Sequence, residues 1–152
     1  VGTNDVISID ASSFSDALVV NSGASDDILI LGSGGSVAQL GDGANVVTVG
    51  AANDGTFNDA IATGSGDDLI KTANAQLTAH LLVNTGGGSD TLEITDDADV
   101  LDADLALLAG IEILKLSGDA VDNSQHLTLA SAAASAGVEA IGASTAGPGA
   151  VV

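Results

Sequence analysis

The chain of 152 residues contains no cysteine, methionine, tryptophan or tyrosine, and Phe14 and Phe57 are its only aromatic residues. Without cysteine, neither disulfide bonds nor thiol chemistry can contribute to the protein. A roughly spherical core normally uses aromatic side chains to fill irregular volume. Here aliphatic residues supply nearly all of a hydrophobic content of 45%. This composition favours a thin core of stacked aliphatic rows, as in a solenoid, over a globule.

Positive charge is almost absent as well. Lys71 and Lys115 are the only basic residues apart from two histidines, and 21 acidic residues give a net charge of −19. Such a chain repels nucleic acid and anionic membranes, and it has no apolar run of the roughly 18 residues that membrane insertion requires. The hydrophobic content argues against disorder. The mutual repulsion of the acidic groups instead favours the binding of cations.

Glycine and aspartate recur in units of nine residues. Each unit has Gly at the second place, Asp, Asn or Ser at the sixth, and mostly aliphatic residues at the seventh and eighth; the fourth place is Ser or Gly in all units but one, where it is Phe57. The units are 22–30, 31–39, 40–48, 54–62, 63–71 and 85–93. An imperfect first repeat is expected where Asn4–Ile7 aligns with Asp26–Leu29.

This pattern resembles the RTX nonapeptide G-G-x-G-x-D-x-U-x of calcium-binding β-rolls. The resemblance implies an all-β fold, a right-handed parallel β-roll or β-solenoid, over residues 1–93. Residues 94–141 are expected to continue the solenoid with one or two short helices, and residues 142–152 to form a small-residue linker or inter-subunit tail.

In each unit the glycines would form a tight turn and the aliphatic residues a short strand. The sixth-place residues are 27, 36, 45, 59, 68 and 90. The step of 18 from 27 to 45 predicts one full coil, and the step of 22 from 68 to 90 predicts a coil with an enlarged loop. We therefore expect Leu29 to be buried over Val47, and Ile70 over Leu92.

The sixth-place side chains are expected to point outward between coils. Carboxylates one coil apart lie about 4.8 Å from each other. With the turn carbonyls they would form an oxygen cage suited to Ca²⁺, which accepts six to eight oxygen ligands in loose geometry. Asp27 is expected to pair with Asn45, and Asp68 with Asp90 and, on its other flank, with Asp59 or Asn45.

Asp42 and Asp67 are secondary candidates for this site, and Asn45 and Ser36 depart from the aspartate of the family. The candidate metal ligands are Asp27, Asn45, Asp59, Asp68, Asp90, Asp42 and Asp67, with the turn residues Gly23, Gly41, Gly43, Gly64, Gly66, Gly86 and Gly88.

Simpler interpretations also exist for the glycine turns, the acidic segment and the histidines. The turns could be ordinary β-turns without an ion, although several units in one frame favour calcium. Asp96–Asp104 lacks the central glycine and terminal glutamate of an EF-hand and is better explained as a capped helix start. His80 and His126 have no cysteine or second histidine nearby in the sequence, so surface positions are favoured over zinc binding. No nucleophile motif is present, and we expect no enzyme activity.

Beyond residue 94 the apolar spacing changes from strand to helix. Asp96 or Asp97 could begin a short helix that ends at Gly110. The other expected elements are a strand at Ile111–Leu116, a brief strand at Leu127–Leu129, a second short helix ending at Gly137 and a final rung at Val138–Ile141.

Both ends of the solenoid are expected to accept another copy of the chain, because Val6–Ile9 has no Lys or Pro and the tail ends in Ala150–Val152. We therefore expect a structural protein that binds calcium and assembles head-to-tail into an extracellular filament, surface layer or matrix. Alternatives are a calcium-binding adhesin module or a non-catalytic RTX appendage of a secreted enzyme.

The resemblance implies a secreted or cell-surface protein, exported by the type I route, that folds on meeting external calcium. The second part of the chain is similar to segments of large bacterial surface-layer, adhesin and matrix proteins. Because the chain begins at Val1, a processed form or a fragment is expected.

Overall fold

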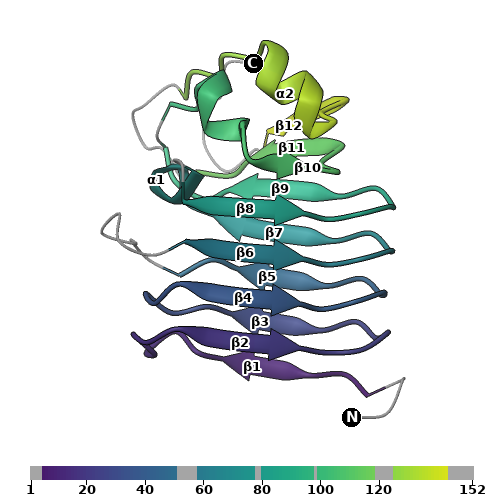
Figure 1. Ribbon diagram of the computed structural model, residues 1–152. Coiled ribbons are helices and arrows are strands. Elements are labelled where there is room, and N and C mark those ends of the chain that lie inside the picture. Colours follow the sequence, from purple (N-terminus) through teal and green to yellow (C-terminus); the bar gives the residue numbers. More distant parts are fainter. Residues whose placement is uncertain (1–4, 51–57, 78–79, 98, 119–124, 144–152) are drawn as a thin grey trace.

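The computed structural model describes residues 5–50, 58–77, 80–97, 99–118 and 125–143. In these residues the chain winds into a β-solenoid, and the strands from β1 to β11 alternate between two parallel sheets stacked along one axis (Figure 1). We call the seven-stranded sheet A and the five-stranded sheet B. The prediction of an all-β parallel solenoid is confirmed.

The strands of each sheet are short and parallel throughout. In spatial order, sheet A consists of β1 (Ser8–Asp10), β3 (Ile28–Ile30), β5 (Val46–Thr48), β7 (Leu69–Thr72), β9 (Thr91–Ile94), β11 (Ile113–Leu116) and β12 (Ala140–Ala143). Sheet B consists of β10 (Leu108–Ala109), β8 (Leu81–Asn84), β6 (Asp59–Ala62), β4 (Ser36–Gln39) and β2 (Leu18–Asn21).

One inward side chain from each strand of sheet A contributes to a continuous buried column. The register pairs Leu29 with Val47, Val47 with Ile70, and Ile70 with Leu92. Each of these residues is 1% exposed or less. Both predicted contacts are confirmed, and the steps of 18 and 22 residues each correspond to one full coil.

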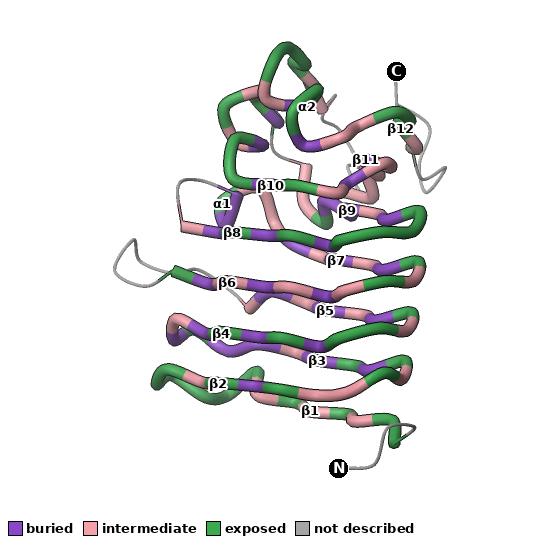
Figure 2. Tube along the Cα trace, turned by 45° about the vertical axis from the view of Figure 1, so that its right-hand side comes forward, coloured by how far each residue is buried: buried purple, intermediate pink, exposed green. Residues whose placement is uncertain are grey.

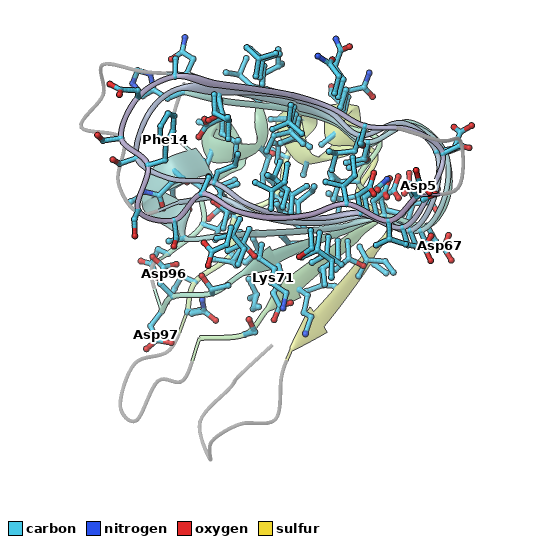
Figure 3. The ribbon with its side chains drawn as sticks, turned by 90° about the horizontal axis from the view of Figure 1, so that it is seen from below. Asp5, Phe14, Asp67, Lys71, Asp96 and Asp97 are labelled. Atoms are coloured by element: carbon cyan, nitrogen blue, oxygen red, sulfur yellow. The ribbon has the colours of Figure 1, made fainter. Side chains whose placement is uncertain are left out.

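Sheet B supplies the facing side of the core. Its buried column consists of Val20, Ala38, Ile61, Val83 and Leu108. Buried and more exposed positions alternate along the strands, as Figure 2 shows, because successive side chains of a strand point to opposite faces. Viewed along the coil axis, the aliphatic side chains fill a flattened oval between the two sheets (Figure 3). Such a thin core needs no aromatic residue.

The predicted alignment of the first repeat is wrong by two residues. Ser8 pairs with Ile28 and Ile9 with Leu29, so Ile7 rather than Asp5 is equivalent to Asp27. The pairing buries the column residue Ile9 against Leu29, which aligning Asp5 with Asp27 would not allow.

The first helix expected in the C-terminal third is much shorter than predicted. A 3-10 helix, η1 (Asp102–Leu105), is followed after a two-residue turn by β10. Val100 forms a bridge with Leu127, and Leu108 pairs with Val83 in sheet B. Only the residues between these two pairings remain available to form a helix.

The second predicted helix, α2 (Ser131–Ala136), is confirmed, and it ends at Gly137 with φ 104°. The strand expected at Ile111–Leu116 is β11, and the final rung is β12, two residues later than predicted. Leu127 forms only an isolated bridge in place of the expected strand. A further helix, α1 (Asn74–Leu77), lies in the loop between β7 and β8.

Sheet A continues across the domain boundary predicted at residue 93, because β9 pairs directly with β11. Of the linker predicted at 142–152, the first two residues end β12, and the others lie outside the described residues.

The two ends of the solenoid differ. β1 and β2 are the outermost strands at the N-terminal end, whereas η1 and α2 lie over the C-terminal end (Figure 1). The Asp102 carboxylate accepts backbone N–H groups of Ala130, Ala132 and Ala133 at 2.6 to 3.0 Å, which holds the start of α2 against η1. This end is therefore partly covered, contrary to the expectation of two open ends.

Candidate metal-binding edge

Four turns that lead from sheet B to sheet A are stacked along one edge of the solenoid. They comprise residues 22–27, 40–45, 63–68 and 85–90, and we call this stack the glycine edge. Asp67 marks it at one end of the flattened cross-section in Figure 3, opposite Phe14.

Glycines allow these turns to approach one another closely. Their φ angles are positive at Gly41, Gly43, Gly64, Gly66, Gly86 and Gly88. A Cβ atom at Gly64 would collide with the carbonyl oxygen of Gly41, and one at Gly86 with that of Gly64. The carbonyl of Gly23 lies against Gly41 in the same way. The predicted role of glycine in tight turns is therefore confirmed for these positions.

Asp27, Asn45, Asp68 and Asp90 form a ladder inside the glycine edge. The backbone N–H of Asp27 donates to Asn45 Oδ1 at 3.0 Å, that of Asn45 to Asp68 Oδ1 at 2.7 Å, and that of Asp68 to Asp90 Oδ1 at 2.8 Å. The predicted pairs Asp27 with Asn45 and Asp68 with Asp90 are thus neighbours. Of the two alternatives for the other flank of Asp68, the neighbour is Asn45.

The ladder side chains do not point outward as predicted. Asp27, Asn45, Asp68 and Asp90 are between 0% and 2% exposed, although three of them are acids. Oδ1 of Asp27 accepts the backbone N–H of Ile7 at 2.8 Å, and Oδ1 of Asp68 and of Asp90 is bound by the backbone as described. The other oxygen, Oδ2 of Asp27, Asp68 and Asp90, is buried without a hydrogen-bond partner. Burying an unpaired polar atom is costly, and more so for a charged one, so these three oxygens require an explanation.

The electrostatic environment of Asp90 also disfavours a buried negative charge at the glycine edge. Burial raises the pKa of Asp90, and the charges of Asp68 and Glu112 raise it further, against the lowering effect of the hydrogen bond from the Asp68 backbone to Oδ1 and of the nearby Thr85 hydroxyl. Lys71 and Lys115, the only Lys or Arg residues of the chain, lie on the outer column of sheet A, in register with Glu93. No Lys or Arg side chain is therefore at the glycine edge to neutralise the ladder.

Asn45 differs from the aspartates in having no unpaired atom. Its Nδ2 donates to the carbonyl oxygens of Gly41 at 3.2 Å, Gly43 at 3.1 Å and Thr63 at 3.2 Å. The first two carbonyls belong to its own turn, and the third belongs to the next coil. In this coil, carbonyl oxygens of the predicted glycines do surround the tip of the ladder side chain.

The secondary candidates Asp42 and Asp67 form an exposed outer row together with Asp26. Asp26 Oδ1 accepts the N–H of Ala44 at 2.8 Å, and Asp42 Oδ1 accepts the N–H and hydroxyl groups of Ser65. Asp67 Oδ1 similarly accepts the N–H of Ser89. These aspartates connect adjacent coils at the surface, and their position does not bring them into the buried ladder.

Asp59 lies away from the glycine edge. It begins β6 in sheet B at the opposite edge, where its Oδ1 accepts the N–H of Ser36 at 2.7 Å. Asp59 and Ser36 therefore form their own pair, and Asp59 is not beside Asp68.

Two features of the edge were not predicted from the sequence. Glu112 extends the ladder by one coil, since its Oε2 accepts the N–H of Asp90 at 2.9 Å. The hydroxyl groups of Ser22 and Thr63 donate to the carbonyl oxygens of Leu40 and Thr85 in the next coil. A hydroxyl residue at the first place of three of the nine-residue units was the available signal for the second feature.

In the part of the chain that the structure describes, no three His, Cys, Asp or Glu side chains converge in a way that could hold a metal ion. An ion at the ladder would therefore need backbone carbonyls among its ligands. His80 forms a hydrogen bond with Asn58 Oδ1 at 2.9 Å, in agreement with its predicted surface position.

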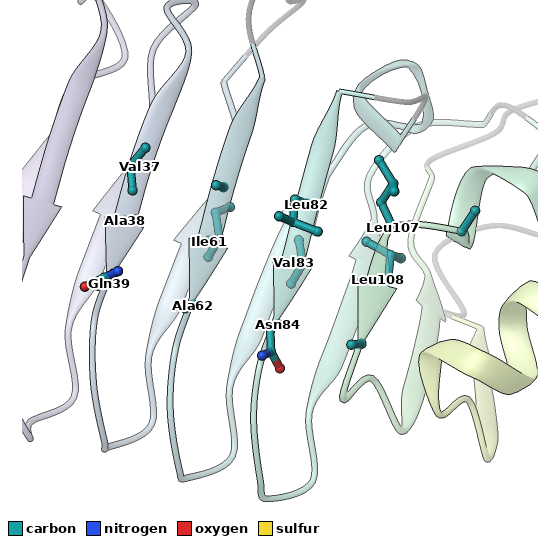
Figure 4. A pocket seen from close by; sticks show the side chains of 13 residues that line it. Val37, Ala38, Gln39, Ile61, Ala62, Leu82, Val83, Asn84, Leu107 and Leu108 are labelled. Atoms are coloured by element: carbon teal, nitrogen blue, oxygen red, sulfur yellow. The ribbon is translucent and has the colours of Figure 1, made fainter.

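The outer face of sheet B is a second surface feature. A shallow groove crosses β4, β6, β8 and β10, with Val37, Leu82 and Leu107 exposed along it (Figure 4). Its polar lining side chains are Gln39 and Asn84, and no charged residue lines it.

Comparisons with models of protein families, with curated proteins and with solved structures found no significant match to this chain. No helix among the described residues has the length and apolar character needed to span a membrane.

Proposed function

We propose that this chain is a non-catalytic structural β-solenoid that binds calcium along the glycine edge outside the cell. The observation that carries the proposal is the set of three buried, unpartnered Oδ2 atoms of Asp27, Asp68 and Asp90. These residues lie in different coils, so a separate cation at each aspartate would satisfy its Oδ2 atom. Together such cations would neutralise the ladder, which has no Lys or Arg beside it. Without a counter-charge these carboxylates destabilise the fold that buries them.

The donor set suits calcium better than other metals. Carboxylate and carbonyl oxygens are hard ligands, and Ca²⁺ accepts many of them in variable geometry. Mg²⁺ demands a tighter octahedron, and softer metals prefer nitrogen or sulfur. Asp27, Asp68 and Asp90 would each hold one ion, with carbonyls of turn residues such as Gly64 and Gly86. Bound calcium would supply positive charge, and the ladder's backbone hydrogen bonds already fix the carboxylates in place.

The extracellular location follows from the calcium concentration that such sites need. A site at ten times its dissociation constant adds about 1.4 kcal/mol of stability, so three sites add about 4 kcal/mol. That is a large part of the stability of a typical domain. Millimolar calcium outside the cell would therefore complete folding after export, as the RTX-like repeats suggest.

The exposed N-terminal end supports assembly into a filament, surface layer or matrix. Among the described residues, β1 is the outermost strand of sheet A at this end, and Val6 beside it is 65% exposed. Parallel strands at an open end can add another copy by backbone pairing. Because η1 and α2 cover part of the other end, β12 is the edge of sheet A that would receive β1 of the next copy.

The groove on sheet B favours a second candidate function, a calcium-stabilised adhesin module that docks an apolar partner. The groove has no aromatic side chain to stack on a sugar ring, which argues against carbohydrate as the partner. In this case the solenoid would stay monomeric and the groove would be the functional surface.

A calcium titration followed by far-ultraviolet circular dichroism and light scattering tests the proposal. We expect calcium, and not magnesium, to increase β-structure reversibly, with EGTA restoring the starting signal. Asp68→Ala should weaken the response. Asp16→Asn is the matched control, because it removes one negative charge from an exposed position at the opposite edge. A calcium-independent signal in the wild-type chain would contradict calcium binding.

Two lysine substitutions separate the assembly routes. Val6→Lys places a charge beside the open edge of β1 and should abolish growth into long particles. Val19→Lys places the same charge on the outer face of sheet B, where the side chain is 67% exposed, and should leave end-to-end growth unchanged. Loss of association in Val19→Lys alone would favour the sheet B surface instead.

A further inference from the structure

The ladder contains one side-chain amide, that of Asn45. All of its polar atoms form hydrogen bonds, whereas each ladder aspartate leaves one buried oxygen without a partner. Asn45 Oδ1 accepts the N–H of Asp27, just as Asp68 Oδ1 accepts the N–H of Asn45. The first side-chain oxygen thus has the same role in each coil. The second atom, Nδ2 in Asn45 and Oδ2 in the aspartates, is the point of difference.

The surroundings of Asn45 Nδ2 identify what each coil offers at this point. Its three acceptors are the carbonyl oxygens of Gly41, Gly43 and Thr63. Two of them come from the second and fourth places of its own unit, and the third comes from the first place of unit 63–71, one coil further along the solenoid. The cluster is therefore an oxygen cage that is stabilised by a hydrogen-bond donor or by a positive charge at its centre.

The same backbone positions recur one coil further along the solenoid. Gly64 is stacked on Gly41, and Gly66 is stacked on Gly43. The N–H of Thr63 donates to the carbonyl oxygen of Asn84, so Thr85, the next residue, begins the turn of the following coil. The carbonyls of Gly64, Gly66 and Thr85 are therefore the counterparts of the Asn45 cage in the coil of Asp68. The Gly64 carbonyl already accepts the N–H of Gly87, and the Thr85 carbonyl accepts the hydroxyl of Thr63, so each has one further lone pair for a donor or an ion.

A carboxylate cannot satisfy such a cage. An amide nitrogen carries two hydrogens to donate, whereas an ionised carboxylate only accepts hydrogen bonds. Asp68 Oδ2 is buried and unpartnered, which is the result expected when an acceptor replaces the donor. Either a proton or a cation must then take the place of the amide hydrogens.

We propose that the side-chain amide of Asn45 is a built-in substitute for the cation, so that its coil is stable without calcium and binds none. This inference rests on the proposed function in taking the ion at Asp27, Asp68 and Asp90 to be calcium. It divides the edge into an ion site at Asp27, an ion-free coil at Asn45, and ion sites at Asp68 and Asp90. The central coil would stay ordered before calcium is bound.

The reciprocal variants Asn45→Asp and Asp68→Asn test this in the full chain. Calcium stoichiometry is measured by isothermal titration calorimetry, and the thermal midpoint is measured in EGTA at neutral pH. Asn45→Asp should bind one more ion per chain than wild type and melt at a lower temperature in EGTA. Asp68→Asn should bind one ion fewer and melt at a higher temperature in EGTA, because its new amide fills the cage.

The Asp68→Asn result separates this proposal from a general loss of a ligand. If Asp68→Asn melts at a lower temperature than wild type in EGTA, the amide does not replace the ion and the proposal is overturned. Asn45→Asp with unchanged stoichiometry overturns it as well. Asp16→Asn controls for the loss of one negative charge, and it should change neither quantity.

The outcomes also distinguish this inference from the proposed function. If the wild-type chain binds no calcium, the proposed function fails, but the melting comparison in EGTA still tests the role of the amide. Asn45→Ala removes the donors without adding charge, so it should lower the midpoint equally with and without calcium. Recovery of the Asn45→Ala midpoint by calcium would contradict the ion-free coil. If Asn45→Asp does not fold, Asp68→Asn and Asn45→Ala decide the question.

Discussion

Lys115 Nζ lies 3.0 Å from Glu93 Oε1, across the neighbouring strands β11 and β9 on the outer face of sheet A. Lys71 is in register with Glu93 on its other side. Both Lys residues of a chain with a net charge of −19 are thus placed against one glutamate. This arrangement leaves the glycine edge without a Lys or Arg neighbour.

We expect Glu93→Gln to lower the stability at neutral pH by about 0.5–1 kcal/mol, since the Lys115 side chain is 41% exposed and the pair is screened. Burial raises the pKa of Glu93, but hydrogen bonds with Ser117 and Lys115 and the charges of both lysines outweigh it and lower the pKa from 4.5. A carboxyl group with a lowered pKa stabilises the folded state at pH values above its pKa in the unfolded chain. This stabilisation is lost as the pH falls through the pKa of the folded state. Denaturant unfolding at neutral pH and at an acidic pH at which the folded carboxyl is protonated should therefore show the difference only at neutral pH; an equal loss at both would contradict it.

Gly64→Ala should destabilise the chain by about 2–3 kcal/mol or prevent folding. Gly64 has φ 93°, and the new Cβ would meet the Gly41 carbonyl of the preceding coil. Gly87→Ala is the matched control, because a Cβ at Gly87 meets nothing within 4 Å. Thermal unfolding in calcium measures both variants. A similar midpoint for the two would show that the stacked turns are not closely packed.

Ile70→Ala should cost about 2–5 kcal/mol, the range for truncating a fully buried aliphatic side chain. Ile70 is 0% exposed and lies between Val47 and Leu92 in the column of sheet A, so neighbours on both sides lose contacts. Leu82→Ala, at a position 53% exposed on sheet B, should cost far less. Guanidinium unfolding in saturating calcium provides the comparison, and equal losses would contradict the assignment of the core.

The coil length and the core column were predictable from the sequence because the nine-residue frame fixes both. The inward ladder was predictable too. Asp27 and Leu29 are two residues apart, and alternate side chains of an extended chain point the same way. Since Leu29 is buried, Asp27 is buried with it. The predicted outward direction was wrong because it ignored this period of two.

The position of Asp59 and the shape of the C-terminal end could not be read from the frame. One coil contains two units, so consecutive units belong to opposite edges of the solenoid. The insertion between residues 48 and 54 interrupts the frame and obscures which edge Asp59 joins. Glu112 was missed because Gly110 follows β10 directly and shortens the turn. These features depend on pairing between distant strands, which local spacing does not encode.

Asp90→Asn should stabilise the calcium-free chain as the pH rises. The pKa of Asp90 is raised from 3.8, chiefly by burial and also by the charges of Asp68 and Glu112. A raised pKa means that the folded state holds its proton more tightly than the unfolded state, so the contribution of Asp90 to stability is lost as the pH increases through the folded value. The asparagine has no such loss, and its amide can donate as Asn45 does.

Thermal midpoints of wild type and Asp90→Asn in EGTA, measured from about pH 3, below the ordinary pKa of Asp, to about pH 7, test this expectation. The two midpoints should be close at the acidic end and diverge toward neutral pH, with Asp90→Asn higher. In saturating calcium the order should reverse at neutral pH, because the ion binds only the ionised carboxylate. Asp67→Asn, at the exposed position beside the ladder, should show no reversal. If Asp90→Asn melted below wild type in EGTA at neutral pH, the buried Oδ2 would not be a source of instability, and the need for a cation at this edge would disappear with it.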